Sequence, residues 1–297
     1  MKKTITLTLI LLLLFSFGCV KETENGATAG KSFKFTGNSG VTAEFQQDAP
    51  PATNFLGDPI EVALKITNRG AVDVASGSLQ ARLQGVAATE IFKPTTKEGS
   101  NDETLLAAEL DPTTTAISLG TITYSPQQMF SAEYKPEIET EICFPYTTKI
   151  DTGNFWISSK QADLDKGKIS SSDNSDAPVH VTKLEEFKGT NQARFQFTVE
   201  NIGKGKIAES CFPEKKTEEA KETVEVSIIE PRGAKCETLG GGSSGKIDLI
   251  SKKKVVRCSI DAPKDSSYAT PLLMEINYNY DLELSKVITI KNLEKTV

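Results

Sequence analysis

Residues 60–66 read Ile60-Glu-Val-Ala-Leu-Lys-Ile66, with apolar side chains at every second position and with Glu61 and Lys65 between them. Successive side chains of a β-strand point to opposite faces, so this stretch predicts a strand with one face on a core and one toward solvent. The same alternation recurs at residues 193–199, 223–228 and 272–280. Helical periodicity is nearly absent, so we expect an all-β protein built from antiparallel strands.

Two of these strands end in the same short sequence. Ile66-Thr-Asn68-Arg-Gly70 is matched by Val199-Glu-Asn201-Ile-Gly203, a step of 133 residues from position 68 to position 201. Asn and Gly tolerate positive φ, so we expect each to close a tight turn after a core strand. We interpret the match as a weak internal repeat of one β module. The strand-Asn-x-Gly signature resembles CARDB and related immunoglobulin-like modules of exported archaeal and bacterial proteins.

A boundary between the two copies is expected in a polar stretch near the middle of the chain. Residues 160–176 are rich in Lys, Asp, Gly and Ser, and Pro178 precedes a new alternating segment. We interpret this stretch as a linker. The expected architecture is two immunoglobulin-like antiparallel β-sandwich domains in tandem, at residues 33–159 and 177–297.

The first residues have the layout of an export signal. Lys2 and Lys3 precede an almost unbroken apolar stretch, residues 4–17, which is too short for a comfortable membrane span. The following Ser16-Phe-Gly18-Cys19 resembles the lipobox of bacterial and archaeal lipoproteins, with Ser16 in place of the usual aliphatic residue. The resemblance implies a signal peptide at residues 1–18, a lipid on Cys19 and a flexible tether at 19–32. An uncleaved anchor and plain secretion are the alternatives.

Four cysteines follow the tether, at positions 143, 211, 236 and 258. An even number in an exported chain permits disulfides. Cys236 and Cys258 lie on two predicted strands joined through a Gly/Ser loop, so we expect them to pair. Cys143 and Cys211 fall in different predicted domains; they are either a staple between the two domains or two buried thiols. No Cys-x-x-Cys spacing occurs, so no zinc site is expected.

Carboxylates gather in and around the predicted linker. Clustered carboxylates between two β modules can hold Ca²⁺ with oxygen ligands. Lys166 and Lys168 interrupt the cluster, and the spacing lacks the bidentate Glu of an EF-hand, so a solvated acidic linker is the alternative. We expect no cofactor unless Ca²⁺ binds here. The candidate ligands are Asp163, Asp165, Asp173 and Asp176.

Two short motifs of enzymes occur outside the context that they need. Gly241-Gly-Ser-Ser-Gly245 matches the nucleophile elbow of hydrolases, but it lies in a Gly/Ser loop and the single His, His180, precedes it. Gly203-Lys-Gly-Lys-Ile-Ala208 matches the dinucleotide fingerprint, but no helix is expected after it. His180 alternates with Val179 and Val181, so we expect it on the outer face of a strand. No catalytic residue is assigned, and no enzymatic activity is expected.

The charge balance bears on the class of partner. A formal net charge of −6 lacks the basic footprint of most nucleic-acid binders, so no nucleic acid is expected. A local run of cations, Lys252 to Lys254 with Arg257, is interpreted as protection of a strand edge.

The whole pattern resembles exported archaeal lipoproteins. It predicts a protein held by its lipid at the outer face of the cytoplasmic membrane, acting as a structural or adhesive module for a protein partner at the cell surface. The alternative is an extracytoplasmic accessory protein that binds sugar, peptide or Ca²⁺ for a membrane transporter or enzyme.

Overall fold

The protein is all-β, as its alternating pattern predicts. The computed structural model describes residues 33, 36–89, 91–108, 111–126, 131–153, 155–158, 169–188, 191–212, 221–262 and 267–293. The expected signal peptide, Cys19 and the tether lie outside these residues. Within the described ranges, no helix has the length and apolarity that a membrane crossing requires.

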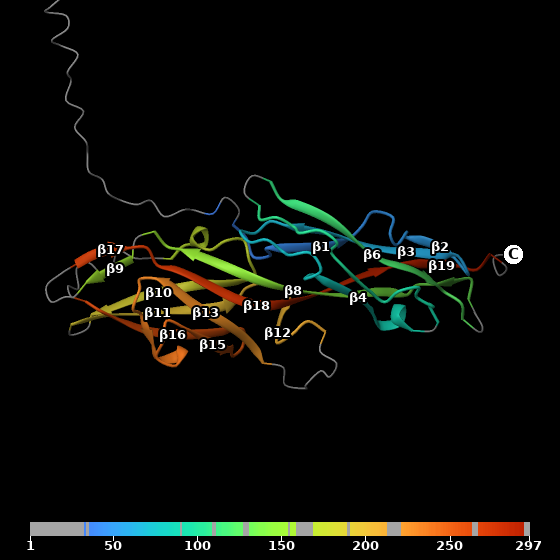
Figure 1. The fold of residues 1–297 in the computed structure, drawn as a ribbon. Helices are drawn as coiled ribbons and strands as arrows, with labels where there is room; N and C mark the ends of the chain where they lie inside the picture. The colour runs from blue at the N-terminus through green and yellow to red at the C-terminus, as the bar shows by residue number, and fades with distance from the viewer. Residues whose placement is uncertain are drawn as a thin grey trace, which may run out of the picture.

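The N-terminal half is a sandwich-like pair of sheets (Figure 1). One sheet has the antiparallel order β1-β3-β6, and the other contains β4 and β5. The alternation at residues 60–66 lies in β3, where Ile60, Leu64 and Ile66 are buried. The strand bounds are β1 Val41–Phe45, β3 Pro59–Asn68, β4 Gln80–Gln84, β5 Glu98–Ser100 and β6 Thr113–Thr123.

The C-terminal half repeats this arrangement. Its first sheet has the order β10-β11-β16-β14, and β13 and β15 belong to the facing sheet. The alternation at residues 193–199 lies in β11, where Phe195, Phe197 and Val199 are buried as predicted. The bounds are β10 Val179–Lys188, β11 Gln192–Asn201, β13 Glu222–Glu230, β14 Lys235–Cys236, β15 Ser244–Leu249 and β16 Lys253–Asp261.

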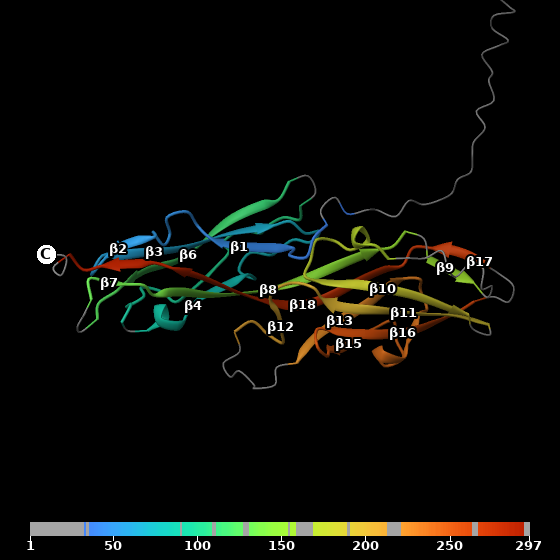
Figure 2. The same cartoon turned by 180° about the vertical axis from the view of Figure 1, so that it is seen from behind.

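Two long antiparallel strands run through both halves (Figures 1 and 2). These are β8 (Glu137–Asp151) and β18 (Leu273–Val287), each 15 residues long, and they pair along their whole length. β8 starts beside β4 and β18 starts beside β13. Because each strand then continues into the opposite half, the halves exchange strands within one chain.

Short strands complete the exchange at both ends of the molecule. β9 (Phe155–Ser158) follows β8 and pairs with β17 (Ser267–Thr270), whereas β19 (Thr289–Lys291) follows β18 and pairs with β2 (Thr53–Phe55) and β7 (Glu133–Tyr134). The same 134-residue step separates β7 from β17 (133 to 267) and β9 from β19 (155 to 289). The internal repeat therefore extends to strand pairing. The remaining elements are β12 (Lys206–Ala208) and the short 3₁₀ turns η1 (Gly85–Ala88), η2 (Ser171–Asp173) and η3 (Glu237–Leu239).

Four aromatic rings pack where β8 and β18 cross between the halves. Phe144 and Tyr280 have centroids 6.1 Å apart at 61°, and Tyr146 and Tyr278 have centroids 6.4 Å apart at 61°. The two pairs repeat each other about the facing residues Pro145 and Asn279. All four rings are buried, so the two halves share one continuous core.

The strand exchange bears on the expected ranges 33–159 and 177–297. Their division at residues 160–176 stays a prediction, but hydrogen-bonded pairing crosses it, because β18 and β19 pair with strands of the first range. The alternation at residues 272–280 predicts a strand correctly. Alternation reports which face of a strand is buried, however, and carries no information about which strand pairs with it.

Candidate interaction site at the junction of the two halves

The first Asn-x-Gly turn lies where β3 reaches the junction. Asn68 is fully buried, and its Oδ1 accepts the N–H of Gly70 at 3.1 Å and the hydroxyl of Tyr146, from β8, at 3.3 Å. Its Nδ2 donates to the carbonyls of Val72, Leu105 and Leu106 at 2.8, 3.2 and 3.0 Å. One amide side chain thus ties β3, β8 and the loop before β6 together.

The second turn repeats this geometry at the end of β11. Asn201 Oδ1 accepts the N–H of Gly203 at 3.1 Å and the hydroxyl of Tyr280, from β18, at 3.4 Å. Its Nδ2 donates to the carbonyl of Gly205 at 3.2 Å, four residues along the chain as at the first turn. Burial raises the pKa of Tyr146 and raises that of Tyr280 to about 12, so both hydroxyls stay protonated donors at neutral pH.

The glycines of these turns are needed for space. Neither Gly70 nor Gly203 adopts a positive φ, so the tolerance of glycine for that conformation is not what the turns use. A Cβ at Gly70 would collide with the Tyr146 hydroxyl and lie 2.7 Å from the carbonyl oxygen of Asp176. A Cβ at Gly203 would collide with the Tyr280 hydroxyl in the same way. Glycine is needed because a tyrosine crosses the backbone at close range.

Asp176 joins the segment before β10 to the N-terminal half. Its side chain is 4% exposed, and Oδ1 accepts the N–H groups of Ser39 and Gly40 at 3.1 and 2.9 Å. Oδ2 lies 3.5 Å from Nε of Arg69, in the middle of the first turn motif. The carboxylate therefore has three partners from the other half.

The expected Ca²⁺ cluster is only partly described. Asp163 and Asp165 lie outside the described residues. Asp173 caps its own turn by accepting the N–H of Ser170 at 2.5 Å, and Asp176 has the partners given above. Among the residues that the structure describes, no three His, Cys, Asp or Glu side chains are placed together to hold a metal ion. Ca²⁺ binding stays a prediction, with two of its four carboxylates located.

His180 is buried at the junction, with 5% of its surface exposed, so its expected place on an outer face is wrong. β10 starts between two layers: Val179 and Val181 face the core, and backbone groups of Gly37, Ser175 and Ala177 interact with the imidazole. Burial lowers the pKa of His180. Its Nε2 has no hydrogen-bond partner among the described residues.

The two enzyme-like motifs lead into strands. Gly241–Gly245 runs from the turn after η3 into β15, which begins at Ser244. Gly203–Ala208 runs into β12, which pairs with β18. A nucleophile elbow and a dinucleotide loop both need a helix at these places. Neither segment has the local structure of its motif.

The four cysteines that the structure describes form two disulfides. Cys236 and Cys258 face each other on β14 and β16, with Cα atoms 4.0 Å apart. Cys143, on β8, is bonded to Cys211, which follows β12, with Cα atoms 5.4 Å apart. The second bond links the range expected for the first domain to the range expected for the second.

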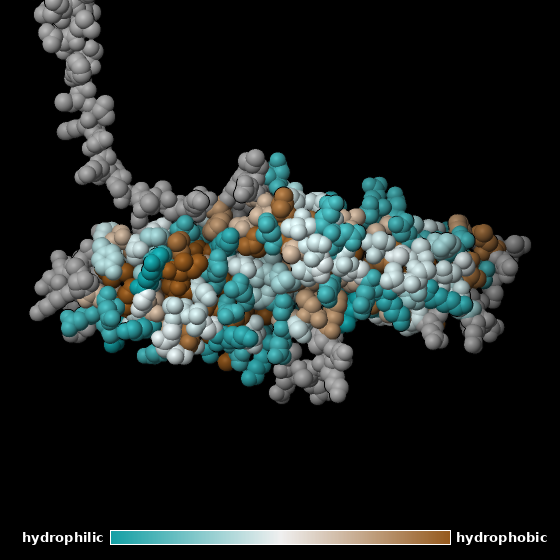
Figure 3. Space-filling view, viewed as in Figure 1, coloured by the Kyte–Doolittle hydropathy of each residue, from teal (hydrophilic) through white to brown (hydrophobic). Residues whose placement is uncertain are grey.

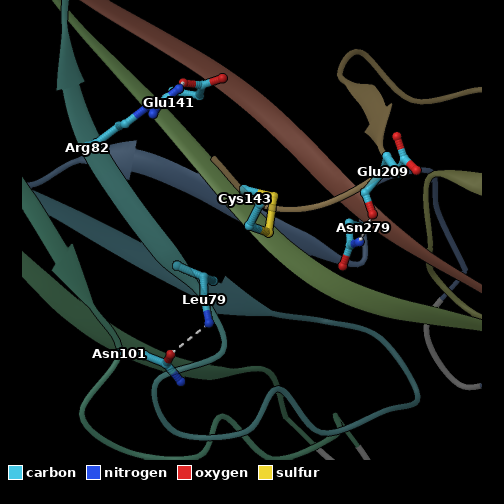
Figure 4. Close-up of a disulfide and its surroundings, with 8 residues drawn as sticks. Leu79, Arg82, Asn101, Glu141, Cys143, Glu209 and Asn279 are labelled. Carbon is cyan, nitrogen blue, oxygen red and sulfur yellow. Dashed lines mark hydrogen bonds and ion pairs between the residues drawn. A yellow bond between two sulfur atoms is a disulfide. The ribbon is translucent and has the colours of Figure 1, made fainter. Parts of the chain in front are cut away.

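The segment around Cys211 is docked by further contacts (Figure 4). On one side of the disulfide, Asn279 Nδ2 donates to the carbonyl of Glu209 at 3.0 Å. On the other side, the Arg82 guanidinium lies 4.1 Å from the ring centroid of Phe212 and 2.5 Å from the buried carboxylate of Glu141. The disulfide is thus one of three attachments that hold this loop against the central sheet.

A cleft of about 540 Å³ opens beside this loop at the junction. Thr147, Asn277 and Asn279 line it from the faces of β8 and β18 that point away from the core, and Thr147 Oγ1 donates to Asn277 Oδ1 at 2.6 Å. The N-terminal half adds Asp73 and Ser78, and the C-terminal half adds Glu209, Thr223, Glu225 and Lys246. The polar amides and hydroxyls can hydrogen-bond a polar ligand. Sequence reasoning missed this site, although Asn277 and Asn279 are uncharged polar residues at the outward positions of a core strand.

Comparisons with known proteins add no relative. No family model matches this chain, and no curated protein matches it. The resemblances to CARDB-like modules and to lipoproteins therefore depend on the turn sequences at residues 66–70 and 199–203 and on residues 16–19.

Proposed function

We propose that this chain is a lipid-anchored protein of the cell envelope and acts as a rigid, non-enzymatic structural or adhesive module. The halves are then two immunoglobulin-like β-sandwiches related to CARDB modules. A lipid on Cys19 holds them at the outer face of the cytoplasmic membrane, where they bind a protein partner. The observation that carries the proposal is the full-length pairing of β8 with β18.

Rigidity follows from the cost of bending at the junction. Tandem domains joined by one linker move relative to each other by default. Here a bend would disrupt β8–β18 hydrogen bonds, the shared aromatic cluster and the contacts of Asp176 with Ser39 and Gly40. Two disulfides in a chain with an export-like leader also favour an oxidising compartment. Such a build suits a spacer or scaffold.

A second function, binding of a polar ligand such as a sugar or peptide, is supported by the junction cleft. Both halves contribute side chains to it, and its floor is made of amides and hydroxyls. The cleft is lined by Tyr146 and Tyr278, but both rings are buried, so recognition would proceed through hydrogen bonds.

Anchoring is tested by expressing the full chain in a prokaryotic host that processes lipoproteins. The wild-type protein should incorporate labelled fatty acid, lose residues 1–18 and sediment with membranes. Cys19→Ala should incorporate no label. A wild-type protein found in the cytosol with its leader intact would refute the anchoring proposal.

Rigidity is tested separately by amide hydrogen exchange on the oxidised, full-length protein. The central residues of β8 and β18, around Pro145 and Asn279, should exchange as slowly as the rest of these two strands. The loop that follows η1 serves as the fast-exchanging reference. Exchange at the centre as fast as in this loop would show a hinge and overturn the scaffold proposal.

A further inference from the structure

A groove of about 850 Å³ on the C-terminal half concentrates positive charge. It lies among β12, β13, β15 and β16, at an edge where hydrophilic residues gather (Figure 3). Two carboxylates, Glu222 and Asp248, accompany its lysines, although the whole chain has a net charge of −6. The lysines that line it are Lys206, Lys221, Lys246, Lys252 and Lys254.

Few of these lysines are neutralised. Lys206 and Lys221 each form one ion pair, at 3.4 Å, and both lysine side chains are more than 70% exposed. Exposed pairs of this kind bind weakly and give way to other anions. Lys246, Lys252 and Lys254 form no ion pair within the described ranges, although the ammonium group of Lys254 attracts the nearby Asp248 carboxylate electrostatically. The groove thus retains cations that can bind an external anion.

The geometry of the β15–β16 turn does not explain Lys252 at its tip. Ile250 and Lys253 close the turn with backbone hydrogen bonds of 3.1 and 3.3 Å, and Ser251 and Lys252 have φ values of 52° and 69°. Turns with two positive φ values favour Asn and Gly, so the turn itself does not select Lys252. Edge protection can account for part of the run, because β14 pairs only with Cys258 and Ser259 and leaves residues 254–257 of β16 paired on one side alone, with β11, among the described residues.

The lining restricts the class of anion. Among the described residues its cations are all lysines, which offer separate point charges and lack the planar fork with which Arg holds a single carboxylate or phosphate. No aromatic side chain is found in this described part of the lining, so the bases of a single-stranded nucleic acid would find no stacking platform there. The lining is concave and comes from several strands, so a chain molecule fits it better than the plane of a bilayer.

From this arrangement we infer that the groove binds a linear anionic polysaccharide, whose regularly spaced carboxylate or sulfate groups contact Lys246, Lys252 and Lys254. Binding does not need the lipid on Cys19. Lys246 also borders the junction cleft, whereas Lys252 and Lys254 line the groove alone. The protein would then hold an acidic glycan on one side of its C-terminal half.

The test is fluorescence anisotropy of labelled heparin oligosaccharide and labelled polygalacturonate with the oxidised full-length protein in mild detergent. We expect binding that weakens steeply with added salt. The triple variant Lys246→Gln, Lys252→Gln, Lys254→Gln should bind both glycans about tenfold more weakly or worse, with a shallower salt dependence. Circular dichroism and thermal melting should match the wild type, because these side chains make no ion pair or side-chain hydrogen bond with the residues that the structure describes.

The control removes three positive charges from the N-terminal half, with Lys93→Gln, Lys97→Gln and Lys135→Gln. These exposed lysines lie outside the groove, and the control should bind as the wild type does. If both variants bind the glycans equally weakly, the loss of binding depends on net charge alone and the proposal is overturned. Binding to vesicles of anionic phospholipid but to neither glycan would overturn it in favour of a membrane. Equal binding of neutral dextran would overturn the role of charge.

Discussion

The two Asn-x-Gly turns share one arrangement and differ in what surrounds it. At both turns the asparagine accepts a glycine N–H and a tyrosine hydroxyl. Asn68 also reaches the carbonyls of Leu105 and Leu106, in the long loop of the N-terminal half. At the second turn, the Tyr280 hydroxyl instead accepts the N–H of Gly205 at 2.8 Å. The repeated sequence determines the turn and its tyrosine, whereas the loops of each half determine the remaining partners.

The largest difference between the halves lies in their cross-links. The C-terminal half contains both Cys236–Cys258 and the partner of Cys143, with sequence separations of 22 and 68 residues. By the entropy of loop closure, Cys143→Ser with Cys211→Ser should lower the free energy of unfolding by about 4 kcal/mol. Cys236→Ser with Cys258→Ser should lower it by about 3 kcal/mol. Urea unfolding followed by circular dichroism measures both, and the reverse order would contradict the loop-length argument.

Removing each asparagine tests the turns themselves. Asn68→Ala removes five hydrogen bonds, although the carbonyls of Leu105 and Leu106 each keep a second donor, and should cost about 3 kcal/mol. Asn201→Ala removes fewer bonds and should cost about 2 kcal/mol. Equal losses in urea unfolding would mean that the extra carbonyl contacts of the first turn contribute nothing.

Adding one methyl group at each glycine sharpens the comparison. Gly70→Ala and Gly203→Ala should each cost about 2 kcal/mol, because the new Cβ meets a tyrosine hydroxyl in a packed site. Combining them with Tyr146→Phe and Tyr280→Phe, respectively, removes the colliding oxygen and should recover part of the loss. Recovery stays partial, since Asp176 and Pro178 also lie within 3 Å of the added atoms. Double-mutant cycles in urea measure the coupling energy between each glycine and its tyrosine. A coupling energy of zero would mean that the added methyl group does not clash with the tyrosine hydroxyl.

The smallest effect concerns pH and only one half, because His180 is the single histidine. Burial lowers its pKa in the folded state, so the unfolded chain binds the proton more readily. Stability is therefore complete above the unfolded pKa of about 6.5 and is lost as pH falls through the folded pKa. His180→Gln should show a shallower decrease in melting temperature between neutral pH and about pH 5 than the wild type. If the melting temperatures of the two proteins fall equally with pH, protonation of His180 does not lower the stability of the fold.

Much of the architecture could be predicted from local pattern. Alternation found β3, β11 and β18, and the matched turns found the repeat, because side-chain period and turn chemistry are local properties. The burial of His180 was missed, since alternation assumes one solvated face and β10 begins between two layers. The exchange of β8 and β18 was missed for a different reason: strand partners are chosen by contacts far apart in the sequence. The junction cleft and the lysine-lined groove were not predicted, because each combines outward side chains of several strands.

The order in which the chain emerges during synthesis gives the strand exchange a further consequence. β2 begins at Thr53 but pairs with β19, whose first residue is Thr289, and Lys286 donates to the carbonyl of Pro50 across 236 positions. β2, one of the first strands to appear, must therefore wait for a partner strand that lies 289 − 53 = 236 positions further along the chain. Such an unpaired strand invites wrong partners while it is open. A cell that makes this protein has reason to keep β2 unpaired with other strands until β19 has been made.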